Sequence, residues 1–259
     1  MSAQLKSSTH GLTMVLTVSN PGQRNALGPA IYAAGIEALN VAETNPDVRS
    51  VILIGEGTTF CAGGDLNRLQ ANRQQPPAVQ TQSIDQLHGW IEAIRAFPKP
   101  VIAAVEGYAA GAGFALALSC DLIVAASDAV FLTSYGQVGL SPDGGTSWQL
   151  ARSLPRQFAS ELLLAGERIG ASRLHALGLV NRVCEPGHAL DTALALAVQV
   201  NAQAPNVLAS GKELLETAVH NSLHAHLAEE QEHFVRNLNH PNAGIGIAAF
   251  LNRQAPEFE

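Results

Sequence analysis

Three short apolar runs without a charged residue constrain the fold of this chain most strongly: SVILI at 50–54, VIAAV at 101–105 and LIVA at 122–125. Runs of this length and composition are typical of strands buried on both faces. Beside them, the segments 29–42 and 84–97 carry apolar residues at three- and four-residue spacing, which indicates helices. Strands that alternate with helices predict the α/β class.

Two further strands are expected at 12–19 and 129–132. A polar stretch around Pro76 and Pro77 predicts a loop of about a dozen residues, within the range 70–83. The character of the chain changes near residue 195. Helical spacing without intervening strands follows at 193–202, 207–219, 223–238 and 243–251. We therefore expect a core over residues 1–195 and a helical region over residues 196–259.

Composition excludes several classes of protein. The net charge of −7 argues against nucleic-acid binding, and the apolar fraction of 47% argues against general disorder. Only 14% of residues are charged, which favours extra burial between subunits. The longest weakly charged stretch, 107–120, is too short for a membrane span, and the first residues do not resemble a secretory signal. Three widely spaced cysteines, Cys61, Cys120 and Cys184, indicate free thiols, so we expect a cytoplasmic protein.

Two glycine-rich segments follow predicted strands and precede predicted helices: TFCAGGDL at 59–66 and GYAAGAGFA at 107–115. Glycine lets the backbone approach a ligand closely, and Asp65 occupies the position of a helix N-cap. Two strand ends of this kind can direct backbone N–H groups at one oxygen and form an oxyanion hole. Taken alone, either segment is also explained by packing.

A third segment, VGLSPDGGT at 138–146, holds an acidic residue near its centre. Pro142 and the pair Gly144 and Gly145 predict a tight turn that displays the Asp143 carboxylate. In apolar surroundings the pKa of such a carboxyl group rises, which suits a general base. On these residues alone, a plain turn aspartate is the simpler interpretation.

Other kinds of site find little support in the sequence. GEGTTF at 55–60 lacks the third glycine of a dinucleotide fingerprint, and neither a GxxxxGK[ST] loop nor a GxSxG motif is present. His220 and His224 are expected to share a helical face at the i, i+4 spacing of a metal-binding pair, but no HExxH signature or cysteine accompanies them. We therefore expect no metal site. His88, on the predicted helix 84–97, faces either a pocket or solvent.

Taken in order, these segments resemble the crotonase (enoyl-CoA hydratase/isomerase) superfamily over nearly the whole chain. NPGQRNALG at 20–28 resembles that family's N-P-x-x-x-N-A-L segment, which lines the site of the coenzyme A adenine. FCAGGDL and GYAAGAGFALALSCDLIVA resemble its two oxyanion segments. VGLSPDGGT and the segment RIGASRLHALGLVNRV at 168–183 also fit the family.

The resemblance implies a fold, a substrate class and an assembly. The fold is a spiral of ββα units, followed by a C-terminal helical region that builds a trimer or a dimer of trimers. The substrate is an acyl-CoA thioester whose carbonyl oxygen is held by the N–H groups of Gly64 and Ala112, so that an enolate is stabilised. The resemblance implies no other tightly bound cofactor.

The reaction that the resemblance implies depends on which acidic residues are present at the matching positions. Hydratases of the family use two glutamates, and the matching positions here are Ala115 and Tyr135, which the resemblance places in the pocket. Asp143 instead matches the acid of family isomerases, including those for epoxyphenylacetyl-CoA and dienoyl-CoA. We therefore expect an enoyl-CoA isomerase in which Asp143 carries out a 1,3-proton shift. The alternatives are an enoyl-CoA hydratase, an aromatic acyl-CoA dehalogenase with a nucleophilic Asp143, and a non-catalytic binding protein of the same fold.

Coenzyme A is anionic and its phosphates need cations. Arg24, inside the matched segment, is the main candidate, and Arg68, Arg73 and Lys212 are weaker ones. By the resemblance, the coenzyme A part of the substrate also contacts Ala26, Ala62, Asp65 and Leu66. The preference for a particular acyl group is expected to depend on the predicted loop 70–83.

Overall fold

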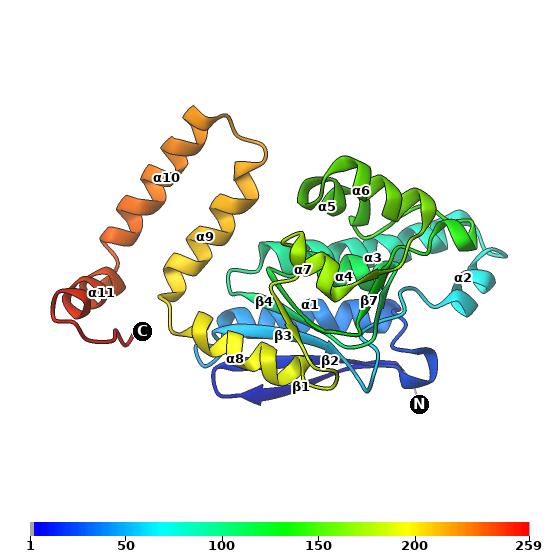
Figure 1. The fold of residues 1–259 in the computed structure, drawn as a ribbon, viewed down its shortest axis with the longest axis horizontal. Coiled ribbons are helices and arrows are strands. Elements are labelled where there is room, and N and C mark those ends of the chain that lie inside the picture. The colour runs from blue at the N-terminus through cyan, green and yellow to red at the C-terminus, as the bar shows by residue number, and fades with distance from the viewer. Residues whose placement is uncertain (1–2, 259) are drawn as a thin grey trace.

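The structure is a computed structural model that describes residues 3–258, and its main sheet runs through the centre of the core (Figure 1). The strands lie in the order β1-β2-β3-β4-β6-β9. Their bounds are β1 Gln4–His10, β2 Thr13–Ser19, β3 Ser50–Gly55, β4 Val101–Val105, β6 Leu122–Ala126 and β9 Arg182–Cys184. β1 and β2 form an antiparallel hairpin, and every other pair in this sheet is parallel.

A second, smaller sheet contains β5 (Tyr108–Ala110), β7 (Val130–Leu132) and β8 (Ile169–Gly170) in that order. β5 follows β4 directly and β7 follows β6 directly, so successive pairs of strands are shared between the two sheets. An isolated bridge between Cys61 and Ala109 brings the segment after β3 into the same pattern. This arrangement confirms the expected spiral of ββα units.

The helices of the core surround these sheets. Their bounds are α1 Pro29–Thr44, α2 Leu66–Asn72, α3 Pro77–Ala96, α4 Ala112–Ser119, α5 Thr146–Ser153, α6 Arg156–Ser160, α7 Ala171–Ala176 and α8 Ala189–Asn201. Short 3₁₀ turns lie at Pro21–Gln23 and Gly136–Val138, and a π-helical turn lies at Glu161–Ala165. The predicted helix at 29–42 is confirmed within α1, and those at 84–97 and 193–202 are confirmed within α3 and α8 for all but their last residue.

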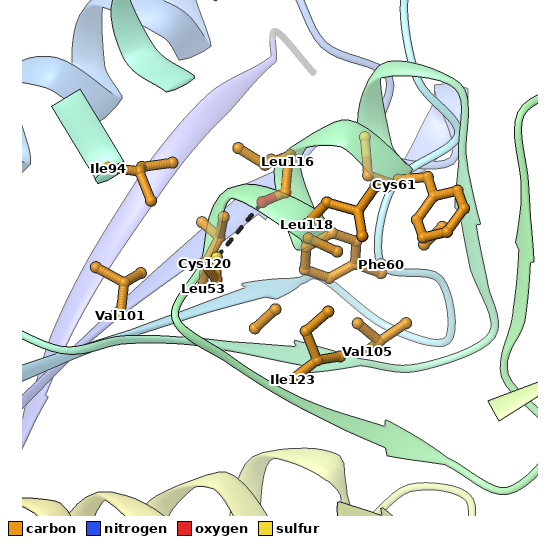
Figure 2. Packing of buried hydrophobic residues seen from close by; sticks show 14 of the residues in the cluster. Leu53, Phe60, Cys61, Ile94, Val101, Val105, Leu116, Leu118, Cys120 and Ile123 are labelled. Atoms are coloured by element: carbon orange, nitrogen blue, oxygen red, sulfur yellow. Dashed lines mark hydrogen bonds between the residues drawn. The ribbon is translucent and has the colours of Figure 1, made fainter. Parts of the chain in front are cut away.

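Both faces of the main sheet are covered, which explains why its strands carry uninterrupted apolar runs. Ile52, Ile102 and Val124 point to one face and pack against α8. Alternate residues of the same strands, such as Leu53 and Ile123, point to the other face and join the larger core (Figure 2). At about 25 cal/mol per Å² of apolar surface, burial on both faces is the main stabilising contribution in such a sheet.

Helix α4 is buried along its whole length, against α5, β5 of the smaller sheet and α3. It contacts the core so closely that a Cβ atom on Gly113 would lie 2.4 Å from the carbonyl oxygen of Cys61. Burial raises the pKa of the Cys61 thiol to about 12, so this cysteine stays neutral and unreactive. Figure 2 shows Cys61 and Cys120 among the apolar side chains of this core.

The predicted polar loop around Pro76 and Pro77 is wrong. Only residues 73–76 separate α2 from α3, and Pro77 is the first residue of α3. Proline is favoured at the first helical position, because its missing N–H would have no partner there. Of the polar residues that follow Pro77, Thr81 and Gln82 are exposed, whereas Ser83 is buried.

The C-terminal helices α9 (Pro205–Ala218), α10 (Leu223–Leu238) and α11 (Pro241–Leu251) extend away from the core as an arm (Figure 1). The boundary predicted near residue 195 falls inside α8, which packs on the main sheet, so the arm leaves the core after Asn201. His220 follows the end of α9 and His224 lies in α10, so the expected shared helical face of this pair is wrong.

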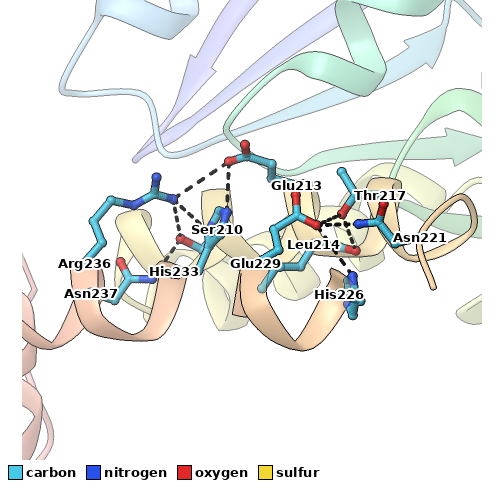
Figure 3. Close-up of polar contacts among 10 residues, drawn as sticks. All are labelled: Ser210, Glu213, Leu214, Thr217, Asn221, His226, Glu229, His233, Arg236 and Asn237. Carbon is cyan, nitrogen blue, oxygen red and sulfur yellow. Dashed lines mark hydrogen bonds and ion pairs between the residues drawn. The ribbon is translucent and has the colours of Figure 1, made fainter. Parts of the chain in front are cut away.

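Polar contacts hold α9 against α10 (Figure 3). The Glu229 carboxylate accepts hydrogen bonds from Thr217 Oγ1 at 2.8 Å and Asn221 Nδ2 at 2.7 Å. Toward the other end of the hairpin, Ser210 Oγ accepts a hydrogen bond from Asn237 Nδ2 at 2.8 Å. These side chains fix the hairpin, while large apolar residues of the arm stay exposed, including Leu223 and Phe234 on α10 and Phe250 on α11.

Candidate active site

The two glycine-rich segments meet at the carboxyl ends of β3 and β4. Cys61 N donates to Tyr108 O and Ala110 N donates to Cys61 O, both at 2.9 Å. Gly63 has φ +94°, and a Cβ atom there would lie 2.7 Å from Ala110 O and 3.3 Å from Ala112 N. Only glycine therefore fits at position 63, and its absence of a side chain lets the first segment lie directly against the start of α4.

This contact brings two unpaired N–H groups into one cavity wall. Gly64 and Ala112 both line the same cavity, and within residues 3–258 neither N–H group has an acceptor. Ala112 is the first residue of α4, where an N–H has no partner within the helix and the helix dipole adds positive potential. Two such donors match the requirements of an oxyanion hole.

The segment 20–28 forms hydrogen bonds with the segment that carries the first donor, Gly64 N. Leu27 N donates to Gly63 O at 2.7 Å, and Ala62 N donates to Arg24 O at 3.0 Å. Asn25 ties the segment to the end of β3, because its Nδ2 donates to Glu56 O and Thr59 O. The predicted N-cap is confirmed: Asp65 Oδ1 accepts from Asn67 N at 2.9 Å and from Arg68 N at 3.3 Å.

Asp143 lies on another wall of the same cavity, in the turn that the glycines at 144 and 145 permit. Tyr135 Oη donates a hydrogen bond to Asp143 Oδ1 at 2.7 Å and lies 3.1 Å from Thr146 Oγ1. Thr146 Oγ1 in turn donates to the carbonyl oxygen of Asp143 at 2.8 Å. These bonds hold the carboxylate from one side and leave it facing the cavity.

Burial raises the pKa of the Asp143 carboxyl, and the hydrogen bond from Tyr135 and the nearby charge of His88 lower it in part. Burial also raises the pKa of the Tyr135 hydroxyl, and the negative charge of Asp143 adds to that increase. Tyr135 therefore remains a neutral hydrogen-bond donor. A carboxylate with a raised pKa accepts a carbon-bound proton more readily than an exposed one does.

The cavity has a volume of about 420 Å³. Its apolar wall comes from α2, α3 and the segment around the 3₁₀ turn at Gly136–Val138. These residues are Leu66, Leu69, Ile84, Val138, Leu140 and Pro142. Asp143 is the one carboxylate among the described lining residues, and His88 also lines the cavity.

Of the two positions that match hydratase glutamates, only Tyr135 lines the cavity. Ala115 is fully buried, and a Cβ atom at Gly144 would lie 2.9 Å from the Ala115 Cβ. The expectation that Ala115 belongs to the pocket is therefore wrong, because the turn that carries Asp143 covers it.

The residues expected to contact coenzyme A fall into two groups. Ala62 and Leu66 line the cavity, whereas Ala26 is buried and Asp65 caps α2 beside it. Arg24 is exposed and Arg73 lies at the mouth of an adjoining hollow on α2. Arg68 is held inside by a 2.6 Å hydrogen bond from its Nη1 to Ser83 Oγ. These cations lie on or beside the segments that border the cavity.

Lys212 lies away from this cavity. Its Nζ forms an ion pair with Asp121 Oδ2 at 2.6 Å and donates to Lys99 O at 3.1 Å. It therefore joins α9 of the arm to the amino ends of β4 and β6, at the opposite edge of the sheet from Gly64.

Sequence reasoning missed Thr146, Leu69 and Ile84 as parts of this site. A threonine three residues after a turn aspartate is a recognisable signal, because threonine hydroxyls in turns commonly form hydrogen bonds with nearby backbone groups. No comparable signal marks the two apolar residues. Within residues 3–258, no group of three His, Cys, Asp or Glu side chains could hold a metal ion, and no helix is long and apolar enough to cross a membrane.

Comparisons with known proteins agree with this geometry. A family model described as enoyl-CoA hydratase/isomerase matches residues 9–259. The 2,3-dehydroadipyl-CoA hydratase of Escherichia coli (strain K12) is 34% identical over 246 residues, which cover 95% of this chain and 94% of that protein. The 1,2-epoxyphenylacetyl-CoA isomerase of the same organism is 32% identical over 246 residues, with the same coverage of 95% and 94%.

Among solved structures, the crystal structure of an enoyl-CoA hydratase from Polaromonas sp. JS666 is similar at a TM-score of 0.98. The two chains are 64% identical, and the match covers 99% of this chain and 100% of the other. The family model, both relatives and this structure span the oxyanion segments and the Asp143 turn together. The chain therefore belongs to the enoyl-CoA hydratase/isomerase family.

Proposed function

We propose that this protein is an enoyl-CoA isomerase in which Asp143 moves a proton between two carbons of an acyl-CoA thioester. The observation that carries the proposal is the single carboxylate among the described lining residues, set in the same cavity as two unpaired N–H groups. One base and one oxyanion hole are enough for a proton shift. Such a shift involves no net oxidation, so it needs no cofactor besides the coenzyme A of the substrate.

The steps follow from the geometry of the cavity. The thioester oxygen accepts hydrogen bonds from Gly64 N and Ala112 N, which makes the adjacent α-carbon more acidic. The Asp143 carboxylate removes a proton from that carbon, and the electrons of the broken C–H bond form a dienolate with the β,γ double bond. Asp143 then returns the same proton to the γ-carbon. The double bond moves to the α,β position, and the carboxylate is regenerated.

Hydration is the second candidate, and the names of two similar proteins favour it. Addition of water across an α,β double bond needs a group that activates the water and a group that protonates the α-carbon. Here Ala115 lies under the Asp143 turn and Tyr135 is a neutral donor, so Asp143 alone would have to supply both functions. The residues of the cavity therefore favour isomerisation.

The purified protein should convert 3-hexenoyl-CoA into the conjugated 2-enoyl thioester, seen as a rise in ultraviolet absorbance. Crotonyl-CoA should lose none of its absorbance, because no pair of acids is present to add water. Loss of crotonyl absorbance would establish the hydratase and overturn the isomerase. If neither absorbance changes, enoyl-CoA isomerisation of unbranched chains is refuted, and a trapped aryl ester on Asp143 would then support the dehalogenase.

We also propose that the arm assembles copies of this chain, as a trimer or a dimer of trimers. A hollow of about 920 Å³ lies between α9, α10 and α11, and Phe250 on α11 is 83% exposed. Apolar surface of this extent is typical of an interface. Phe250→Ser should shift the mass measured by light scattering toward the single chain. Val41→Ser, an exposed apolar substitution on α1, should leave the mass unchanged, and an assembled Phe250→Ser protein would contradict this role of the arm.

A further inference from the structure

The two oxygens of the Asp143 carboxylate have different surroundings. Oδ1 accepts the 2.7 Å hydrogen bond from Tyr135 Oη. Among residues 3–258, Tyr135 is the one other residue that donates to this carboxylate. Tyr135 thus holds the catalytic group through Oδ1, and no other described residue donates to Oδ2, on a side chain that lines the cavity.

The protons of the two hydroxyl groups settle the direction of these bonds. Each hydroxyl has one proton to donate. Thr146 Oγ1 gives its proton to the carbonyl oxygen of Asp143 at 2.8 Å, so Tyr135 can give its own to Oδ1. Tyr135 is 8% exposed and Thr146 is fully buried, so water competes poorly for either bond. The result is a closed set of hydrogen bonds between the 3₁₀ turn and the start of α5.

We propose that Tyr135 is a positioning residue that pins Asp143 Oδ1, so that Oδ2 alone removes and returns the proton of the substrate. This inference rests on the proposed isomerase. A 1,3-shift needs one oxygen that reaches two carbons in turn, and a carboxylate free to rotate would present either oxygen to either carbon. A hydrogen bond to the charged form also favours ionisation, which opposes the effect of burial on Asp143.

Other charged or titratable groups face this carboxylate as well. His88 on α3 lines the cavity, and its positive charge lowers the pKa of Asp143. Tyr32 on α1 is raised in pKa to about 12, mainly by burial, with Arg68 and Asp143 as neighbouring charges. Tyr32 therefore stays neutral over the range of an assay. Because the charge of His88 acts on Asp143, the experiment also uses a His88→Gln background.

The test measures the pKa of Asp143 without substrate, from the carboxylate band in infrared difference titrations against the Asp143→Asn protein. Tyr135→Phe keeps the ring and removes the hydroxyl. We expect the pKa of Asp143 to rise by about one to two units, the size of one hydrogen bond to a charged group. The acid limb of the kcat profile should move upward with it, while KM changes little. Tyr108→Phe, on an exposed side chain of β5, is the matched control.

Thr146→Val provides a second variant, because it removes the hydroxyl that orients Tyr135 and keeps the volume of the side chain. It should raise the pKa in the same direction by a smaller amount. An unchanged Asp143 pKa in both variants would overturn the inference while leaving the isomerase intact. Retained turnover in Asp143→Asn would instead overturn the proposed function, and the infrared titration would still report whether Tyr135 acts on the carboxylate.

Discussion

Asp143→Asn should lower kcat for 3-hexenoyl-CoA isomerisation by about 10³-fold, within the range that general acid–base groups contribute. Asparagine keeps the size of the side chain and can accept the hydrogen bond from Tyr135, but its amide cannot take up a proton near neutral pH. The oxyanion donors at Gly64 and Ala112 are untouched, so KM should change little. Steady-state rates at saturating and limiting substrate separate the two effects.

Asp47→Asn is the matched control, because Asp47 precedes β3 and lies at the edge of the sheet opposite to the cavity. It should retain full activity. Thermal unfolding tests whether the Asp143→Asn protein is folded. Burial raises the pKa of Asp143 in the folded chain above its unfolded value, so the stability that this group contributes at low pH is lost as the pH rises through the folded pKa.

The asparagine side chain is neutral, so folding of the variant buries no charge at this position. The Tm of the variant should therefore exceed that of the parent protein, on the order of 2 °C at about pH 7. The difference should shrink below about pH 4, where the parent carboxyl group is protonated in both states. An inactive but less stable variant would indicate a disrupted turn. Near-parental turnover in a well-folded variant would remove Asp143 from the mechanism.

The α/β core could be predicted because its strands are buried on both faces. Runs such as SVILI and VIAAV have few alternatives to a central strand, and α8 and the larger core cover their two sides. β1 was missed for the opposite reason. Its sequence, QLKSSTH, is polar and almost fully exposed, and it is held as an edge strand by backbone pairing with β2. Backbone pairing of an edge strand is difficult to recognise from the pattern of hydrophobic residues.

The site could be predicted as a set of segments and less well as a set of contacts. Glycines and the turn around Asp143 marked the oxyanion donors and the base, since each needs a special backbone conformation. The hydrogen bond from Tyr135 to Asp143 depends on how the 3₁₀ turn lies against α5, and no spacing rule predicts it. Ala115 was placed in the pocket because the sequence does not show that the Asp143 turn covers it.

Gly63→Ala should lower kcat by about 10²-fold, the effect of one misplaced oxyanion donor. The new Cβ would lie 2.7 Å from Ala110 O, so the segments carrying Gly64 and Ala112 must separate. The backbone at 63 also has φ +94°, which strains any other residue. Together these effects should reduce the free energy of unfolding by about 2 to 3 kcal/mol.

Gly57→Ala separates the effect of backbone strain from the effect of the close contact between the segments. Gly57 has a similar φ of +76°, yet a Cβ atom there would meet nothing within 4 Å. This control should therefore show backbone strain of about 1 kcal/mol in urea unfolding and no loss of turnover. If the oxyanion hole depends on the close approach of the two segments, kcat falls only in Gly63→Ala. Equal turnover in both variants would mean that the N–H groups of Gly64 and Ala112 do not hold the oxygen on which the reaction depends.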